Sequence, residues 1–150
     1  MTRAVFDTNV FLRALINPRS PTGRLLSEFS DEYVLFVSPA IVFELLSVAT
    51  RPRLQARFPH LAQLDYAAVL AVFANAQVVE PGHIPSVSRD AGDDKILACA
   101  HAAQADYLVT EDEDLLVLGI YEGTRICTVA AFIDIVTSQA GGSRAAEDES

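Results

Sequence analysis

Acidic residues follow directly after short apolar runs at two places in this chain. Asp7 ends the run Ala4–Phe6, whose lack of polar alternation predicts a strand buried on both faces. Asp112 follows another predicted strand, Asp106–Thr110, which is the fourth along the chain. Because ligands of open α/β sheets bind beyond the carboxyl ends of the strands, neighbouring strands would bring both carboxylates to one crevice. Like charges this close repel strongly in a low dielectric unless a cation or a proton relieves them.

A purely structural role for these acids stays open at this point. Asp7 or Thr8 could cap the helix predicted after them, because aspartate and threonine are favoured N-cap residues. The acidic run 111–114 could be a solvated turn, although that explanation is weaker for Asp112 and Asp114 than for their neighbours. Other acids in the chain decide between these alternatives.

Three further aspartates, Asp90, Asp93 and Asp94, begin another predicted helix. The apolar stripe of that helix consists of Ile96, Leu97 and Ala100. Asp93 precedes these residues by three, four and seven positions, which predicts that it lies at the top of the inward face, with Asp94 about 100° away. Capping explains Asp90 completely and Asp93 less well. Whether Asp90 or Asp94 shares a role with Asp93 stays open.

Glu44 is the fourth candidate acid, in a helix predicted to follow the second strand. Taken alone, it fits the polar face of that helix together with Ala40, Ser47 and Arg51. Taken jointly, Asp7, Glu44, Asp93 and Asp112 each follow a strand at one edge of the predicted sheet. Oxygen-only clusters bind hard cations such as Mg²⁺ or Mn²⁺. The chain contains no Gly-rich phosphate loop or His-containing metal motif that would compete with this interpretation.

The elements that must position these acids alternate between strands and helices. Strands are predicted at 4–6, 33–37, 77–80, 106–110 and 125–129, with helices at 8–16, from Pro21, from Pro39 to about Thr50, over 61–74, from Asp90 and over 130–136. A basic turn is expected at 51–57. This alternation predicts an α/β fold with a helix-covered, mostly parallel five-stranded sheet in the order 3-2-1-4-5.

Length and composition indicate one domain with a substantial core. The chain has 150 residues, of which 51% are hydrophobic, and a net charge of −9, which argues against a nonspecific nucleic-acid binder. Residues 1–137 are expected to form the domain and 138–150, rich in Gly, Ser, Ala and acid, a disordered tail. Cys99 and Cys127 fit buried free thiols in a reducing compartment. Without a membrane span or signal peptide, a cytoplasmic protein is expected.

Four segments in this order resemble the PIN-domain ribonucleases, many of which are toxins of bacterial toxin–antitoxin pairs (the VapC-like proteins). The resemblance covers about Arg3 to Val136. Its segments are Val5-Phe-Asp7-Thr8-Asn9-Val10, Glu44 in its helix, Asp93-Asp94-Lys95-Ile96-Leu97-Ala98 and Tyr107-Leu-Val-Thr110-Glu-Asp112-Glu-Asp114-Leu115. No single segment is very specific, but their combination and spacing are.

The resemblance implies a set of site residues and partners. It makes Asp7, Glu44, Asp93 and Asp112 the catalytic, metal-binding acids, with Mg²⁺ or Mn²⁺ as cofactor and Asn9, Thr110 and Asp114 in support. It implies an RNA substrate, a cognate antitoxin and a homodimer. The basic residues available for RNA phosphates are Arg13, Arg51, Arg53, Arg57 and Lys95, each of which could instead be a solvated charge or an antitoxin contact.

The leading hypothesis is therefore a metal-dependent endoribonuclease that acts as a toxin. Two alternatives remain open from the sequence. One is a catalytically silent PIN-like scaffold that binds RNA or protein, although such a scaffold has no reason to retain four acids. The other is a Mg²⁺-dependent phosphoryl-transfer domain of receiver-like architecture, which also places aspartates at strand ends.

Overall fold

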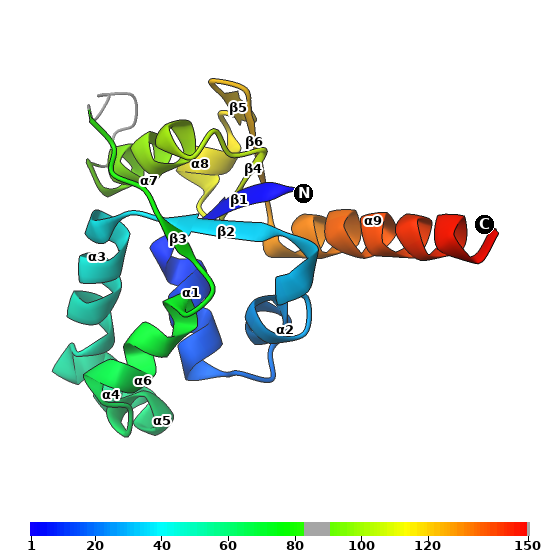
Figure 1. The fold of residues 1–150 in the computed structure, drawn as a ribbon. Coiled ribbons are helices and arrows are strands. Elements are labelled where there is room, and N and C mark those ends of the chain that lie inside the picture. The colour runs from blue at the N-terminus through cyan, green and yellow to red at the C-terminus, as the bar shows by residue number, and fades with distance from the viewer. Residues whose placement is uncertain (83–90, 150) are drawn as a thin grey trace.

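The protein is built around one sheet with helices on both faces (Figure 1). The computed structural model describes residues 1–82 and 91–149, and the side chains of 1–82 and 94–139. The strands are β1 (Arg3–Phe6), β2 (Val34–Val37), β3 (Gln77–Val78), β4 (Tyr107–Val109), β5 (Ile120–Tyr121) and β6 (Thr124–Cys127). Their order is β3-β2-β1-β4-β6-β5, with every pair parallel except β5 and β6.

Nine α-helices occur in the described residues. They are α1 (Thr8–Ile16), α2 (Pro21–Ser27), α3 (Pro39–Ala49), α4 (Pro52–Arg57), α5 (Pro59–Ala62), α6 (Tyr66–Leu70), α7 (Ala91–Ala102), α8 (Glu113–Leu116) and α9 (Val129–Glu149), with 3-10 turns at Ser30–Glu32 and Ala71–Phe73. Two of them start at Pro21 and Pro39, as the sequence predicts, and each has a serine cap before the proline. Ser20 accepts from the Gly23 N–H at the start of α2, and Ser38 accepts from the Ile41 N–H at the start of α3.

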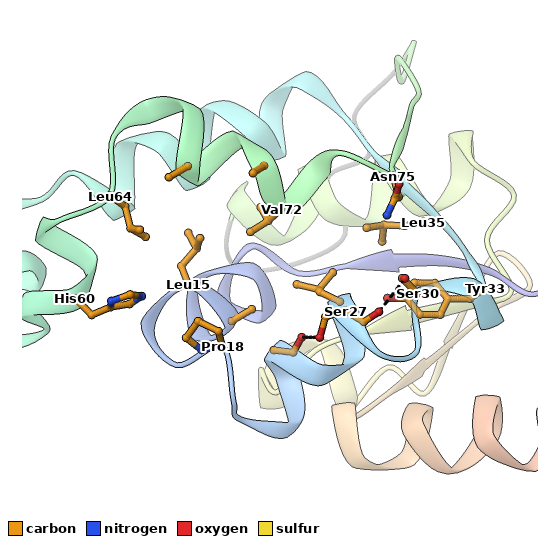
Figure 2. A pocket seen from close by; sticks show the side chains of 15 residues that line it. Leu15, Pro18, Ser27, Ser30, Tyr33, Leu35, His60, Leu64, Val72 and Asn75 are labelled. Atoms are coloured by element: carbon orange, nitrogen blue, oxygen red, sulfur yellow. Dashed lines mark hydrogen bonds between the residues drawn. The ribbon is translucent and has the colours of Figure 1, made fainter.

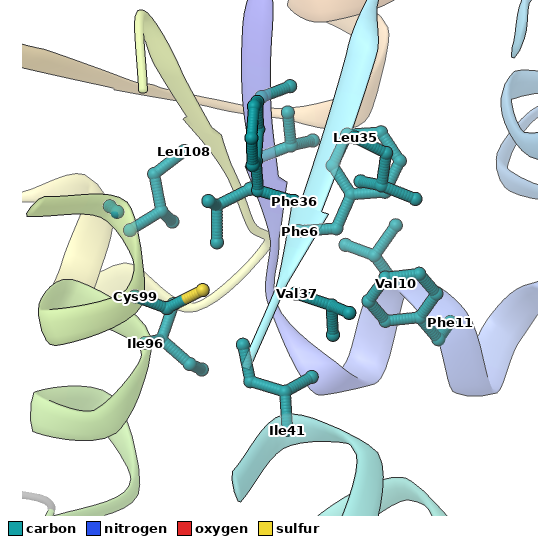
Figure 3. Close-up of a cluster of buried hydrophobic side chains, with 14 of the residues drawn as sticks. Phe6, Val10, Phe11, Leu35, Phe36, Val37, Ile41, Ile96, Cys99 and Leu108 are labelled. Carbon is teal, nitrogen blue, oxygen red and sulfur yellow. The ribbon is translucent and has the colours of Figure 1, made fainter. Parts of the chain in front are cut away.

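β1 is central in the sheet, and its residues Ala4, Val5 and Phe6 are fully buried. It pairs with β2 through Val5 and Phe36 and with β4 through Val5 and Leu108, so that strands distant in the sequence flank it on both sides. Helix α7 lies on one side of β1 and β2, and α1 with α2 on the other (Figure 1). The buried cluster between these layers contains Phe6, Phe11, Ile41 and Ile96 (Figure 3).

The sheet has six strands, so the prediction of five is wrong by one edge strand. The segment Ile120–Tyr121 pairs antiparallel with β6 as a tight hairpin. Its two turn residues, Glu122 and Gly123, both have positive φ, of 48° and 84°. Such a turn matches the twist of the two strands that it joins, and a two-residue β5 is too short to show periodicity in the sequence.

Two local predictions are also corrected. Residues 51–57 are not a basic turn, because Pro52–Arg57 forms helix α4 with proline at its first position. The single helix expected over 61–74 is divided, since Asp65 accepts from the Ala68 N–H at 2.8 Å and begins α6 anew.

The C-terminal helix is longer than the sequence pattern indicates. Helix α9 begins at Val129 and ends at Glu149, whereas the sequence predicts a helix over 130–136. The proposed boundary between residues 137 and 138 falls inside this helix, and the division into a domain and a tail stays a prediction. In the part of the chain described, no helix combines the length and apolar character that crossing a membrane requires.

Phe132 packs α9 against the sheet, and replacing its side chain should strongly destabilise the protein. The ring is fully buried and lies 5.8 Å from Phe6, 5.3 Å from Tyr33 and 5.7 Å from Tyr107, measured between ring centroids. We expect Phe132→Ala to lower the free energy of unfolding by about 3–5 kcal/mol in urea titrations. Phe43→Ala, at a side chain that is 71% exposed, should change it by less than about 0.5 kcal/mol. Equal effects would contradict this account of the core.

Candidate active site at the carboxyl edge of the sheet

Asp7 stands at the carboxyl end of the central strand and is buried. Its side chain is 6% exposed, and its backbone N–H donates to the Val109 carbonyl at 2.9 Å, which ties the end of β1 to β4. Asp7 occupies the N-cap position of α1, but its carboxylate makes no capping hydrogen bond there. The contact of this carboxylate that meets hydrogen-bond geometry is instead with Thr110, and the nearby Asn9 N–H of the first turn acts on it electrostatically.

One hydroxyl joins Asp7 to Asp112. The Thr110 Oγ1 donates to Asp7 Oδ2 at 2.7 Å and accepts from the backbone N–H of Asp112 at 3.0 Å. Asp112 in turn caps α8, because its Oδ1 accepts from the Asp114 N–H at 2.9 Å. Asp114 thus acts on Asp112 through its backbone, while its own side chain is exposed.

Glu44 is held by a residue that the sequence did not single out. The Thr8 Oγ1 donates to Glu44 Oε2 at 3.0 Å, and Thr8 itself is 3% exposed. The sequence feature that could have identified Thr8 is its position at the start of a helix, directly after the aspartate that ends the strand. Thr8 and Thr110 therefore orient two carboxylates that lie in different places, Glu44 on α3 and Asp7 between β1 and α1.

The charges of these acids act on one another. Burial raises the pKa of Asp7 above its ordinary value, and the negative charges of Asp112 and Glu44 raise it further. The Thr110 hydroxyl and the nearby Asn9 backbone N–H oppose this shift by favouring the ionised form. The site thus disfavours a charged Asp7 unless a proton or a cation compensates it.

The third predicted acid lies partly beyond what the structure describes. Asp90 and the side chain of Asp93 are outside the described residues, although Asp93 belongs to α7. Asp94 is 7% exposed, so it is a buried acid at the start of α7, and its angle to Asp93 stays a prediction. Its charge contributes to raising the pKa of Tyr121, after burial and Glu122. Among the described side chains, no three His, Cys, Asp or Glu residues form a preorganised metal-binding group.

Residues 3–114 match the PIN domain family. This chain belongs to that family. PIN domains are a family of nucleases, and those nucleases typically use divalent metal ions. The uncharacterized protein MJ1680 of Methanocaldococcus jannaschii is 31% identical over 118 residues, which cover 77% of this chain and 74% of the relative.

Two solved structures share the PIN fold at low sequence identity. PAE2754 from Pyrobaculum aerophilum has a TM-score of 0.58 at 15% identity, over 91% of this chain and 98% of that one. VapBC2 from Rickettsia felis, solved bound to a DNA fragment from its promoter, has a TM-score of 0.57 at 12% identity, over 85% and 98%.

The predicted basic residues divide into near and distant groups in this PIN domain. Arg13 is exposed on α1, four residues after Asn9. Arg51, Arg53 and Arg57 are exposed at α4, which follows the end of α3 remote from the sheet (Figure 1). Lys95 is exposed on α7, beside a 210 Å³ pocket between α7 and the start of α3.

A separate apolar pocket of about 360 Å³ lies against α1 and α2 (Figure 2). Leu15, Tyr33, Leu35 and Val72 contribute to its wall, and none of the described acids lines it. His60, at its rim, is its one ionisable residue besides Tyr33 among those described. This pocket lacks the acid chemistry found at the end of β1.

Asp7→Asn should stabilise the metal-free protein at neutral pH. Because the pKa of Asp7 is raised on folding, its stability contribution is full below the unfolded pKa and is lost as the pH rises through the folded value. The amide oxygen of asparagine at this position can still accept from the Thr110 hydroxyl. Because the amide does not ionise, the variant does not lose stability as the pH rises. Thermal denaturation in chelator should show a higher Tm for the variant at pH 7, with the difference shrinking toward pH 4. Glu122→Gln, at an exposed acid, is the control. A lower Tm for Asp7→Asn at pH 7 would contradict this assignment.

Proposed function

We propose that this PIN domain is a divalent-metal-dependent endoribonuclease that hydrolyses RNA phosphodiester bonds. The observation that supports it best is the electrostatic coupling of the buried Asp7 carboxylate to Asp112 and Glu44, whose negative charges help to raise its pKa. Carboxylates that repel one another in the free protein are the ligands that release protons and gain stability when a cation binds.

The donors present fit Mg²⁺ or Mn²⁺, since they are oxygen atoms only. Asp7, Glu44, Asp93 and Asp112 would hold the ion. When bound, it supplies a hydroxide at neutral pH and stabilises the oxygen that leaves phosphorus.

The neighbouring residues of the chain would keep these ligands in place. Thr110 and Thr8 fix the carboxylates of Asp7 and Glu44 through the hydrogen bonds described above. Asn9 and Asp114 support Asp7 and Asp112. Orientation of the ligating groups by such outer contacts is typical of metal sites.

We further propose that the nuclease is the toxin of a type II toxin–antitoxin pair in the cytoplasm. The likeness in fold to VapBC2 supports this role. The expected partners are the RNA substrate, a cognate antitoxin and a second copy of this chain, with no membrane partner. Binding experiments with candidate antitoxins would identify the cognate partner.

The purified protein should cut a mixed RNA pool in Mg²⁺ or Mn²⁺ and stop when chelator is added. Asp7→Asn and Asp112→Asn should each lower the rate by about 100-fold or more, because each removes a charged ligand. Asparagine at position 112 can still cap α8, so the fold is retained. Glu122→Gln should cleave as the parent does. Full activity of either aspartate variant in Mg²⁺ or Mn²⁺, or full activity of the parent in chelator, would contradict the proposal.

Thr8 offers a test of the site that does not require turnover. Thr8→Val removes the donor to Glu44 at similar volume, while Thr8→Ser keeps it. We expect calorimetry to show about 10- to 100-fold weaker Mn²⁺ binding for the valine variant and near-parent binding for the serine variant. If both variants bind Mn²⁺ like the parent, the hydroxyl does not position Glu44 for the ion.

A further inference from the structure

A groove lined by residues of α1 and by Glu111, the residue before Asp112, contains a cation and an aromatic ring. We name it the α1–α9 groove, after the helices that form its walls. Its volume is about 510 Å³, and its lining includes Arg13, Asn17, Ser20, Phe58, Glu111 and Val129. That volume lies within the roughly 300–1,000 Å³ of typical small-molecule sites, which suits single nucleotides and not a duplex.

Both walls of the groove contain residues that are close in the chain to the proposed site residues. On α1, Arg13 lies four residues after Asn9, on the same exposed stripe and about 6 Å further along the helix axis. On the other wall, Glu111 directly precedes Asp112 in the chain. A strand whose phosphate sits at Asp7 and Asp112 would therefore enter this groove with its next residues.

Arg13 is the charge available to an anion here. Its side chain is exposed, and the one ion pair found among the described residues joins Arg24 to Glu28 elsewhere. Glu111, the one acid among the described lining residues, has Oε1 engaged by the Val129 N–H at 2.9 Å, at the start of α9. The anion-binding side of the groove is thus the α1 wall. A free guanidinium suits a phosphate, which it can bind with two parallel hydrogen bonds.

Phe58 supplies a flat surface in the same groove. It is half-buried between α4 and α5, so part of its ring faces the groove, and the Arg57 guanidinium lies 5.2 Å from its centroid. Proteins that bind single-stranded nucleic acid combine cations for the backbone with aromatic rings on which bases stack.

We propose that the α1–α9 groove binds the RNA nucleotides next to the scissile phosphate, with Arg13 at a backbone phosphate and Phe58 against a base. This proposal rests on the proposed function, because it extends the substrate path away from the acids. It assigns single-stranded RNA as the substrate form. It also explains how a chain with a net charge of −9 holds a polyanion, through one local cation and one ring.

The test is binding of a fluorescent 12-nucleotide single-stranded RNA to Asp112→Asn protein in Mg²⁺, measured by anisotropy at several salt concentrations. Adding Arg13→Gln should weaken binding about tenfold and lower the slope of log affinity against log salt by about 0.7, the loss of one single-strand phosphate contact. Adding Phe58→Leu should weaken binding at least about fivefold without changing that slope, because stacking is lost and charge is not. With otherwise unaltered protein, both changes should raise KM more than they lower kcat.

Two control variants test whether weaker RNA binding is specific to the groove. They separate it from the effect of removing any positive charge or any exposed aromatic ring. Arg125→Gln removes an exposed arginine on β6, and Tyr66→Leu removes an aromatic residue that is 65% exposed on α6. Both should bind RNA like the parent, and all variants should keep the parent Tm within a few degrees.

Two outcomes would overturn the proposal, and they differ in what else they affect. If the parent binds and cleaves RNA but the groove variants match the controls, the groove does not hold substrate and is left to a protein partner, while the proposed function stands. If neither the Asp112→Asn protein nor the unaltered chain binds or cleaves any RNA, the proposed function fails and the groove proposal falls with it.

Discussion

The hydrogen bond from Thr110 to Asp7 is the contact on which the site depends. It spans only 2.7 Å between the ends of two neighbouring strands, and the same hydroxyl accepts from the Asp112 N–H. Without it, Asp7 would be a buried carboxylate with burial and two like charges against its ionised form. The hydroxyl offsets part of that cost, and the remainder keeps the pKa of Asp7 above its ordinary value.

The fold explains why this contact can exist at all. β1 is covered on both faces and flanked by β2 and β4, so that its last residue emerges among elements from both halves of the chain. The aromatic rings of Phe6, Tyr33 and Phe132 meet beneath it and fix the layer on which α1 and α9 rest. Because a packed core resists small shifts, the geometry of the carboxylates follows from the apolar contacts behind them.

Sequence reasoning predicted the sheet well where burial determines the pattern. The apolar runs of β1, β2 and β4 and the serine caps of α2 and α3 lie where expected, and the strand order follows from the position of β1. The reasoning failed where turn geometry or long-range contacts decide. The Glu122–Gly123 hairpin needed backbone conformation, the burial of Asp94 needed tertiary packing, and the contact between Thr8 and Glu44 joins residues 36 apart in sequence.

The proposed RNA substrate is a polyanion, and this chain is itself acidic, so the proposed function requires contacts that do not depend on overall charge attraction. The carboxylates repel phosphate until a cation is bound, and the surface as a whole carries a net charge of −9. Long-range steering of RNA toward this surface is therefore unfavourable, and any productive contact has to be short-ranged. In the proposed groove, Arg13, one helical turn from Asn9, and the Phe58 ring meet that requirement because both act over a few ångströms. The arrangement favours substrates that fit the groove over those that are merely charged, so that shape and stacking would contribute more to selectivity than electrostatic attraction does.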